Sequence, residues 1–317
     1  MSMPERKFYL LTDSPCDFSQ QMVEDTEIGM LHFTYTEAGK DDGLNGVDDL
    51  FVSRSAHDFY EAVRKGATPM TSQPSQMEFE KTFRACAQLD MPSVYLALSS
   101  GISGCYEGAC SALARVKEDL GRPDLPIYIV DSKLASTAQY LYVVEAIRQR
   151  DKGLTAQEFV KWAEEARYYV QTIFMVEDLD ALHRGGRVPK SVAVIGGALD
   201  VKPMLSFDLD GALSVIGISR GRKKGLKKMA SFYEKNHNDD LFSNLVCTGN
   251  ADCPKDSDRL SEIIHKQDDS VVTMVSTIGP TIGCHVGAGM VSCCFWGSDR
   301  RKGASVSDKI AHDVKGR

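Results

Sequence analysis

Short apolar runs alternate with helical patterns through the first half of the chain, and this alternation constrains the fold more than any other feature. The runs lie at residues 8–11, 30–35, 94–98 and 127–130, and residues 106–118 carry one of the helical patterns between them. Strands that alternate with helices pair in parallel, because each crossover returns the chain in the same direction. The sequence therefore predicts an α/β domain built on a parallel, Rossmann-like sheet.

The second half has a different pattern. After an apolar run at residues 173–176, residues 202–209 and 212–218 flank the dipeptide Asp210-Gly211, which is a strong hairpin signal. Further strands are expected around Leu245 and at residues 271–275. This half predicts an α+β domain with a mixed or antiparallel sheet.

A domain boundary is expected between the two halves. Helices are predicted at residues 137–149 and 156–170, the second introduced by a capping box of Thr155 and Glu158. We divide the chain into an α/β domain at residues 1–160 and an α+β domain at residues 161–317. Residues 36–49 are expected to form a surface loop, and residues 298–317 a mobile or weakly helical tail.

Composition excludes some functions. A net charge of −7 and a pI near 5.6 argue against a nucleic-acid binder, which needs an excess of Lys and Arg. The nine cysteines form no CxxC pair and indicate reduced thiols. No signal-peptide core and no apolar stretch of about 18 residues is present. We expect a cytoplasmic protein without a membrane span, and transient contact with a membrane surface stays open.

Two hydroxyl-rich turns stand at predicted strand ends. Residues 99–104 read SSGISG and follow the run at 94–98, and residues 71–75 read TSQPS. In open α/β sheets, ligands bind at the carboxyl ends of the strands, where hydroxyls and free N–H groups hold anions. The alternative is that both turns only cap the helices that follow them.

Two glycine-flanked basic residues lie in the second half. His285 lies within the glycine-rich residues 278–289, and Arg187 follows the pair Gly185-Gly186. Glycines allow close approach of a ligand, and a guanidinium suits a phosphate or carboxylate. The alternatives are a structural histidine and an exposed turn. The basic residues 220–228 indicate a solvated helix face or a surface for an acidic partner.

Enzyme signatures are mostly missing. The chain has no GxSxG, GxxxxGK[ST], HExxH, EF-hand or CxxC pattern, so we expect no catalytic residue, no metal and no cofactor. Hydroxyls, one histidine and one arginine bind an acid more readily than they perform chemistry on it.

Seven short motifs in a fixed order resemble the DegV family of bacterial fatty-acid-binding proteins. The resemblance runs from residue 8 to about residue 297, nearly the whole chain. The motifs are Thr12-Asp13-Ser14, residues 71–75, residues 99–104, Val130-Asp131-Ser132, Gly185-Gly186-Arg187, Lys202-Pro203 and residues 285–289. Each motif alone is weak, and their order makes the resemblance specific.

The resemblance implies a two-domain α/β protein that buries one long-chain fatty acid between its domains. The carboxylate would be held by Thr71 and Ser103, with Ser99 and Ser100 as neighbours and His285 close by. The fatty acid would then be the ligand of a lipid-binding protein that is not itself an enzyme.

The resemblance also implies a partner. Some members of the family present the acyl carboxylate to a fatty-acid kinase, and Arg187 would then face the kinase or the transferring phosphate. We expect the acyl pocket to be lined by Ile102, Phe174 or Met204.

One alternative function stays open. A serine- or cysteine-dependent hydrolase or acyltransferase would use Ser103 or Cys105 as nucleophile, with His285 as the base that the resemblance places nearby. Cys105 and Ala288 depart from the family's usual Thr and Pro, and Ser136-Thr137-Ala138 replaces a more glycine-rich helix start. These departures put the preferred acyl chain and the local loop shape in doubt more than they do the carboxylate site.

Overall fold

The computed structural model describes residues 5–40, 43–193, 200–238 and 243–303. Its first sheet has four parallel strands in the order β2-β1-β6-β7, which confirms the predicted parallel sheet. The strands are β1 (Tyr9–Asp13), β2 (Gly29–Leu31), β6 (Ser93–Ala97) and β7 (Ile127–Asp131). The run predicted at residues 30–35 is divided, because β2 ends at Leu31 and the next strand belongs to another sheet.

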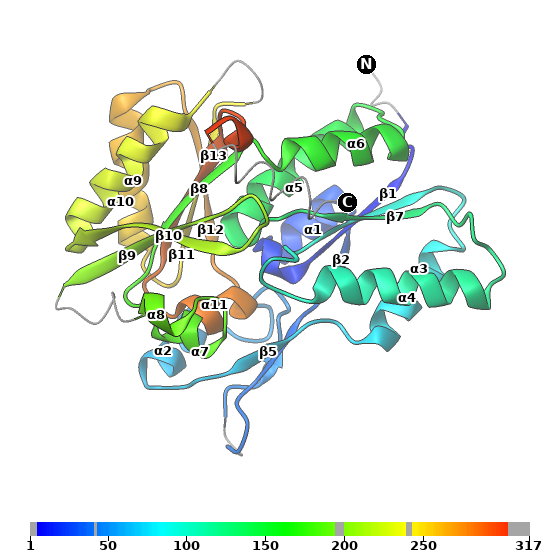
Figure 1. Ribbon diagram of the computed structural model, residues 1–317, viewed down its shortest axis with the longest axis horizontal. Coiled ribbons are helices and arrows are strands. Elements are labelled where there is room, and N and C mark those ends of the chain that lie inside the picture. The colour runs from blue at the N-terminus through cyan, green and yellow to red at the C-terminus, as the bar shows by residue number, and fades with distance from the viewer. Residues whose placement is uncertain (1–4, 41–42, 194–199, 239–242, 304–317) are drawn as a thin grey trace.

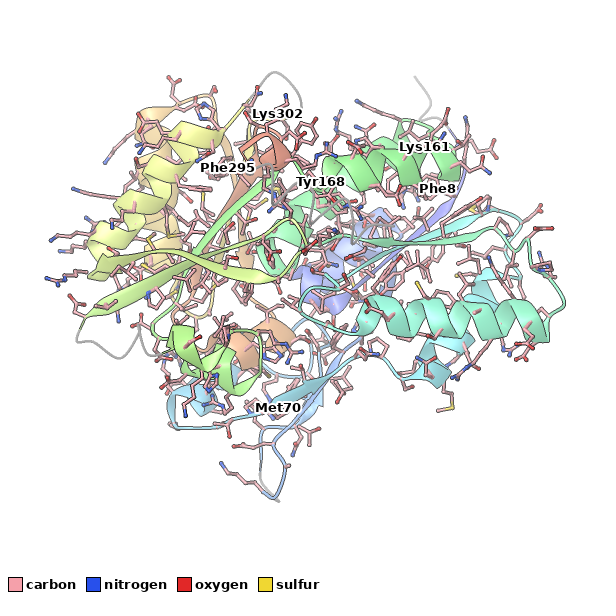
Figure 2. All side chains as sticks on the ribbon, in the orientation of Figure 1. Phe8, Met70, Lys161, Tyr168, Phe295 and Lys302 are labelled. Atoms are coloured by element: carbon pink, nitrogen blue, oxygen red, sulfur yellow. The ribbon has the colours of Figure 1, made fainter. Side chains whose placement is uncertain are left out.

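Helices connect the strands of the parallel sheet and pack beside it (Figure 1). Of these, α1 (Gln20–Thr26) joins β1 to β2 and α4 (Cys105–Asp119) joins β6 to β7, while α3 (Gln76–Cys86) precedes β6, and α5 (Ser136–Asp151) and α6 (Ala156–Ala166) follow β7. The capping box of Thr155 and Glu158 begins α6 as predicted. Phe8 packs against Phe159 of α6, with ring centroids 4.7 Å apart (Figure 2).

The second sheet has six strands in the order β10-β9-β8-β13-β11-β12 and is mixed, as predicted. Only β11 and β12 pair in parallel among its described strands. The strands are β8 (Val170–Met175), β9 (Val201–Phe207), β10 (Leu213–Arg220), β11 (Leu245–Asn250), β12 (Val272–Thr277) and β13 (Val291–Trp296). The predicted helix 156–170 was too long, since it ends at Ala166 and Val170 begins β8.

The mixed sheet lies between two layers of helix (Figure 1). One face is covered by α9 (Arg222–Asn236) and α10 (Pro254–Gln267), and α5 packs against strands β8, β11 and β13. The β9–β10 hairpin is present, and its tip residue Gly211 has a φ of +81°, which favours glycine. The strands of the parallel sheet precede residue 160 and those of the mixed sheet follow it, while the division into two domains there stays a prediction.

Shorter elements surround the space between the sheets. A small sheet in the order β4-β3-β5 lies near α2 and α11, and one buried apolar cluster extends through both halves of the chain. These elements are η1 (Ser14–Cys16), β3 (Thr34–Thr36), β4 (Gly46–Val47), α2 (Ala56–Arg64), β5 (Met70–Ser72), α7 (Asp180–Arg184), α8 (Lys190–Ala193), α11 (Pro280–Val286) and η3 (Arg300–Gly303). Residues 304–317 of the predicted tail lie outside the described residues.

Within the described ranges, no helix combines the length and the apolar character that a membrane span requires.

Two buried carboxyl groups join the first half of the chain to α11. Asp17 accepts a hydrogen bond from the Gly279 N–H at 2.8 Å, and Asp48 accepts bonds from the N–H and hydroxyl of Thr281 at 3.1 and 2.5 Å. The prediction of residues 36–49 as a surface loop was therefore wrong in part, because Asp48 is fully buried and β4 pairs with β3. Carboxyl oxygens at a helix start satisfy N–H groups that have no partner within the helix.

Stability should fall as pH rises, because burial raises the pKa of Asp17 to about 8. Between the unfolded and folded pKa values the folded state holds more protons, so the free energy of unfolding decreases with increasing pH. We expect Asp17→Asn to remove part of this dependence. From about pH 5 to about pH 8, wild type should lose about 5 °C more in Tm than the variant.

The control is Asp124→Asn, which changes an exposed carboxylate and should leave the pH dependence as in wild type. Parallel Tm curves for wild type and Asp17→Asn would contradict the prediction.

Candidate ligand-binding site

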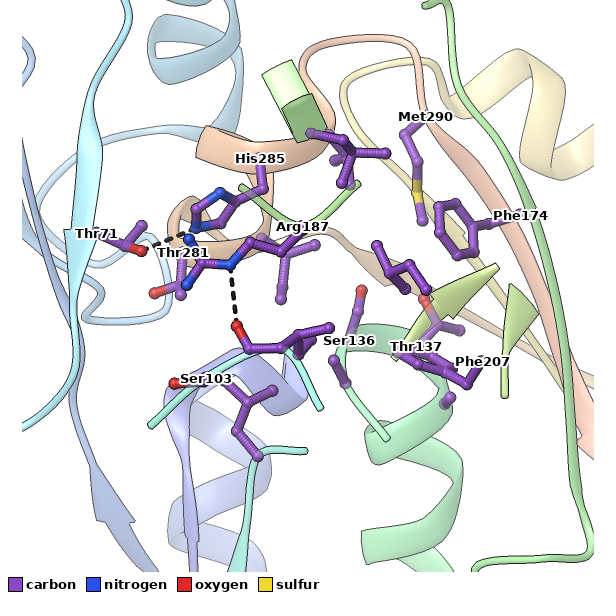
Figure 3. Close-up of a pocket in the computed structure, with 18 of the residues that line it drawn as sticks. Thr71, Ser103, Ser136, Thr137, Phe174, Arg187, Phe207, Thr281, His285 and Met290 are labelled. Carbon is purple, nitrogen blue, oxygen red and sulfur yellow. Dashed lines mark hydrogen bonds between the residues drawn. The ribbon is translucent and has the colours of Figure 1, made fainter. Parts of the chain in front are cut away.

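A cavity of about 350 Å³ lies where the two sheets, α5 and α11 meet (Figure 3). Its walls are mostly apolar, and polar side chains gather in two places along them. The lining includes Phe33, Thr71, Ser72, Gln73, Leu98, Ile102, Ser103, Ser136, Thr137, Thr172, Phe174, Leu182, Arg187, Phe207, Leu213, Thr281, Ile282, His285, Val286, Met290, Ser292 and Cys294.

Thr71 and His285 meet at one end of the cavity. The Thr71 hydroxyl lies 2.8 Å from Nε2 of His285 (Figure 3), although the two residues are 214 positions apart. Thr71 is in β5, opposite Tyr35 of β3, so the TSQPS segment is not only a helix cap. Ser75 of that segment is the residue that caps α3. The capping interpretation is therefore confirmed for Ser75, whereas Thr71 lies in a strand and lines the cavity, and its role in binding stays a prediction.

His285 is held as a neutral imidazole. Burial, with the charge of Arg187, lowers its pKa to about 4. Its Nδ1 has no hydrogen-bond partner among the described residues. The ring fits closely over Gly185, where a Cβ would lie 2.3 Å from Nδ1. The paired glycines therefore make room for the histidine.

Arg187 brings a positive charge into the same end of the cavity. Its Nε donates to the Ile102 carbonyl at 2.9 Å, and its Nη1 donates to the Gly185 carbonyl. Burial lowers its pKa, yet a guanidinium stays protonated at neutral pH. No ion pair joins it to an acidic side chain in the part of the chain that the structure describes. A cation without a counter-ion inside a largely apolar cavity favours an anionic ligand.

Of the three serines in the SSGISG turn, Ser103 reaches the cavity. Its Oγ accepts a bond from the Cys105 N–H at 3.2 Å, which leaves the hydroxyl proton available to a ligand. Ser99 and Ser100 do not line the cavity, because their hydroxyls donate to the Gly211 carbonyl at 2.8 Å and to Asp131 at 2.6 Å.

Cys105 is poorly placed to be a nucleophile. Its thiol is buried beside the Tyr95 hydroxyl, 3.2 Å away, and burial raises its pKa well above the ordinary value. Ser103 makes no hydrogen bond to a histidine or carboxylate among the described residues. His285 is hydrogen-bonded to Thr71. Nucleophilic catalysis needs a base in contact with the nucleophile, so this arrangement suits binding better.

Two of the three predicted acyl-pocket residues reach the cavity, and the third lies on the far face of the mixed sheet. Ile102 and Phe174 line the cavity. Met204 does not: it belongs to a separate apolar cluster with Met175, its partner across the strands, under α9. Neighbouring residues of a strand alternate between faces, so Phe174 and Met175 point to opposite sides. Within the described ranges, no group of three or more His, Cys, Asp or Glu is arranged to hold a metal ion.

Comparison with known proteins assigns the chain to a family. Residues 7–297 match the model of a family described as uncharacterised proteins of the DegV family. The chain belongs to the DegV family. A DegV domain-containing protein of Clostridium perfringens is 31% identical over 93% of this chain and 99% of its own length.

Solved DegV structures share the fold. A DegV lipid binding protein of Thermotoga maritima is 28% identical, with a TM-score of 0.75 over 93% of this chain and 99% of its own. A second Thermotoga maritima protein, described as revealing a fatty acid binding function, is 27% identical, with a TM-score of 0.76 over 93% and 100%. The two-sheet architecture is therefore that of DegV proteins.

The neutral state of His285 in this DegV chain can be measured by NMR. In protein stripped of any bound small molecule, we expect the ring to titrate at about pH 4, well below the usual 6.5. Arg187→Met should raise this pKa, because it removes a like charge, whereas Arg187→Lys should raise it less.

His285→Asn identifies the resonance among the seven histidines. A ring that titrates near 6.5 in wild type would contradict the buried, neutral assignment.

Proposed function

We propose that this protein binds one long-chain fatty acid in the cavity, between the predicted domains 1–160 and 161–317. The observation that carries the proposal is the uncompensated guanidinium of Arg187 at one end of a cavity with mostly apolar walls. A ligand that matches both features has an anionic head and an apolar chain. The relatives described as lipid-binding and fatty-acid-binding support this class of ligand.

The head group would be recognised by Thr71 and Ser103. When Nε2–H of His285 donates to the Thr71 oxygen, the Thr71 hydroxyl proton is left to donate to a carboxylate. Ser103 has a free hydroxyl proton as well. Hydrogen bonds to a charged group contribute about 1.5–3 kcal/mol each, so two of them give the head group substantial selectivity.

The acyl chain would supply most of the affinity. A chain of about 14 methylenes at about 0.8 kcal/mol each contributes about 11 kcal/mol, less several kcal/mol for lost freedom on binding. Affinities in the micromolar range or tighter follow. Such a ligand remains bound through purification.

Native mass spectrometry of the purified protein tests the proposal directly. We expect an added mass of one long-chain fatty acid in near one-to-one amount, with the acid identified after extraction. Protein that carries no lipid and takes up neither palmitate nor oleate would contradict the proposed function.

Substitution of the two hydroxyls tests the head-group site. Thr71→Val and Ser103→Ala should each weaken fatty-acid binding about ten- to a hundredfold, since each removes a bond to the carboxylate. Ser111→Ala, in an exposed turn of α4, is the matched control and should bind as wild type. Affinity is measured by calorimetry on delipidated protein. Unchanged affinity in both variants would place the carboxylate elsewhere.

We also propose that the bound acid is presented, in the cytoplasm, to a fatty-acid kinase that forms acyl phosphate. Arg187 would then serve two steps: its charge favours the carboxylate, and its guanidinium offsets the added charge of the transferring phosphoryl group. Preorganised cations act most strongly on charge that develops in the transition state. The backbone carbonyls of Ile102 and Gly185 hold the guanidinium in place for this role.

The presentation step predicts a larger effect of Arg187→Ala on turnover than on binding. Fatty-acid affinity should fall about tenfold or less, and acyl-phosphate formation with the source organism's fatty-acid kinase and ATP should fall about a hundredfold or more. His285→Ala should be intermediate. Normal turnover by Arg187→Ala would contradict the proposed role, as would equal losses of binding and turnover.

A further inference from the structure

The cavity wall opposite Thr71 carries hydroxyl groups where a plain acyl chain needs only apolar contacts. In Figure 3, Thr71, Ser103, Arg187 and His285 form one group, and Thr137 lies on the other side beside Phe207. The lining there also includes Thr172 and Ser292. We name Thr137, Thr172 and Ser292 the distal hydroxyl group.

Strand register places two of these side chains on one face. Thr172 of β8 is paired with Cys294 of β13, and Phe174 is paired with Ser292. Residues two apart on a strand share a face, so these four side chains form one patch of the mixed sheet. All four line the cavity. The start of α5 covers this patch, with Thr137 in its first turn.

Thr137 and two serines form a small hydrogen-bonded chain that has more donor protons than acceptors in use. Thr137 Oγ1 lies 2.7 Å from Ser292 Oγ and 3.3 Å from Ser276 Oγ, in a chain of three hydroxyls with two bonds. Three hydroxyls have three donor protons, so one O–H in the chain has no acceptor within it. Gly249 allows the close approach, because a Cβ there would lie 2.1 Å from Thr137 Oγ1.

Thr172 provides the clearest sign of a missing partner. Its side chain is 3% exposed, and its Oγ1 has no nitrogen or oxygen partner among the described residues. Its one contact of this kind is with the thiol of Cys294, the cross-strand neighbour, and a thiol is a weak hydrogen-bond partner. A buried hydroxyl with only a weak partner costs free energy, and such a group in a cavity wall favours a polar ligand atom or a bound water.

We propose that the distal hydroxyl group binds a hydroxyl substituent on the acyl chain, so that the preferred ligand is a hydroxy fatty acid. This inference rests on the proposed fatty-acid binding. A ligand hydroxyl both donates and accepts, so it can donate to Thr172 and accept the spare O–H of the Thr137 chain. A plain chain leaves both groups unsatisfied against methylenes.

The test compares stearate with a series of hydroxystearates in which the hydroxyl is moved along the chain. Affinities for delipidated protein are measured by calorimetry. We expect at least one isomer to bind about tenfold more tightly than stearate, from hydrogen bonds made only by that isomer. The isomer that fits also reports how far the distal hydroxyl group lies from the carboxylate.

The matched variants are Thr172→Val and Thr248→Val. Valine keeps the shape of threonine, so Thr172→Val should lower the affinity for the hydroxylated isomer much more than the affinity for stearate, and thereby abolish the preference. Thr248 is a buried threonine on β11 whose hydroxyl faces Ser261 of α10, and its replacement should keep the preference.

Each outcome has a separate meaning. Binding of stearate with no tighter isomer would overturn this inference and leave the proposed function standing, with a water as the partner of Thr172. A preference that survives Thr172→Val would also overturn it, as would a large loss of stearate affinity in that variant, which would place the carboxylate at the distal end. Failure of every acid to bind would instead contradict the proposed function.

Discussion

The attachment of α11 to the first half of the chain is the contact on which the site depends. Asp17 and Asp48 accept the hydrogen bonds of Gly279 and Thr281 in a fully buried setting, where losing either partner leaves an unsatisfied polar group. This contact fixes the start of α11 against η1 and the small sheet. The last turn of α11 then places His285 against Thr71. A helix encoded late in the chain thereby completes a site begun near its start.

The two basic groups at the head of the cavity are held in different charge states by the same surroundings. Burial keeps the imidazole of His285 neutral, whereas the guanidinium of Arg187 has too high a pKa to lose its proton. The charge of Arg187 in turn disfavours protonation of His285. The site thus offers one fixed positive charge and a neutral ring that positions a hydroxyl, which is a stable arrangement across the physiological pH range.

Local signals explain what the sequence could predict. The parallel sheet follows from the alternation of runs, and the β9–β10 hairpin from Asp210-Gly211. Residues that the motifs singled out at 71, 103, 187 and 285 do line one cavity. The serine pattern of the turn alone does not show which hydroxyl faces the cavity, and the preference for Ser103 came from the family resemblance. The hydroxyls of Ser99 and Ser100 face other sides of the same turn.

Long-range register explains what the sequence could not predict. Thr172 and Ser292 become neighbours only through the pairing of β8 with β13, and nothing near either residue signals it. Met204 was misplaced for the related reason that the face of a strand depends on its partners. Asp48 lies in an acidic, glycine-containing stretch that is typical of exposed loops, and its burial depends on Thr281, 233 residues away.

The separation of Thr71 and His285 by 214 positions has a consequence for synthesis of the protein. A nascent chain can complete its parallel sheet when residue 131 has left the ribosome, but the head-group end of the cavity stays open until α11 emerges. Domains generally fold in order from the N-terminus during translation. Under the proposed function, ligand capture would be restricted to chains that are nearly finished, and truncated products would lack the means to hold the ligand.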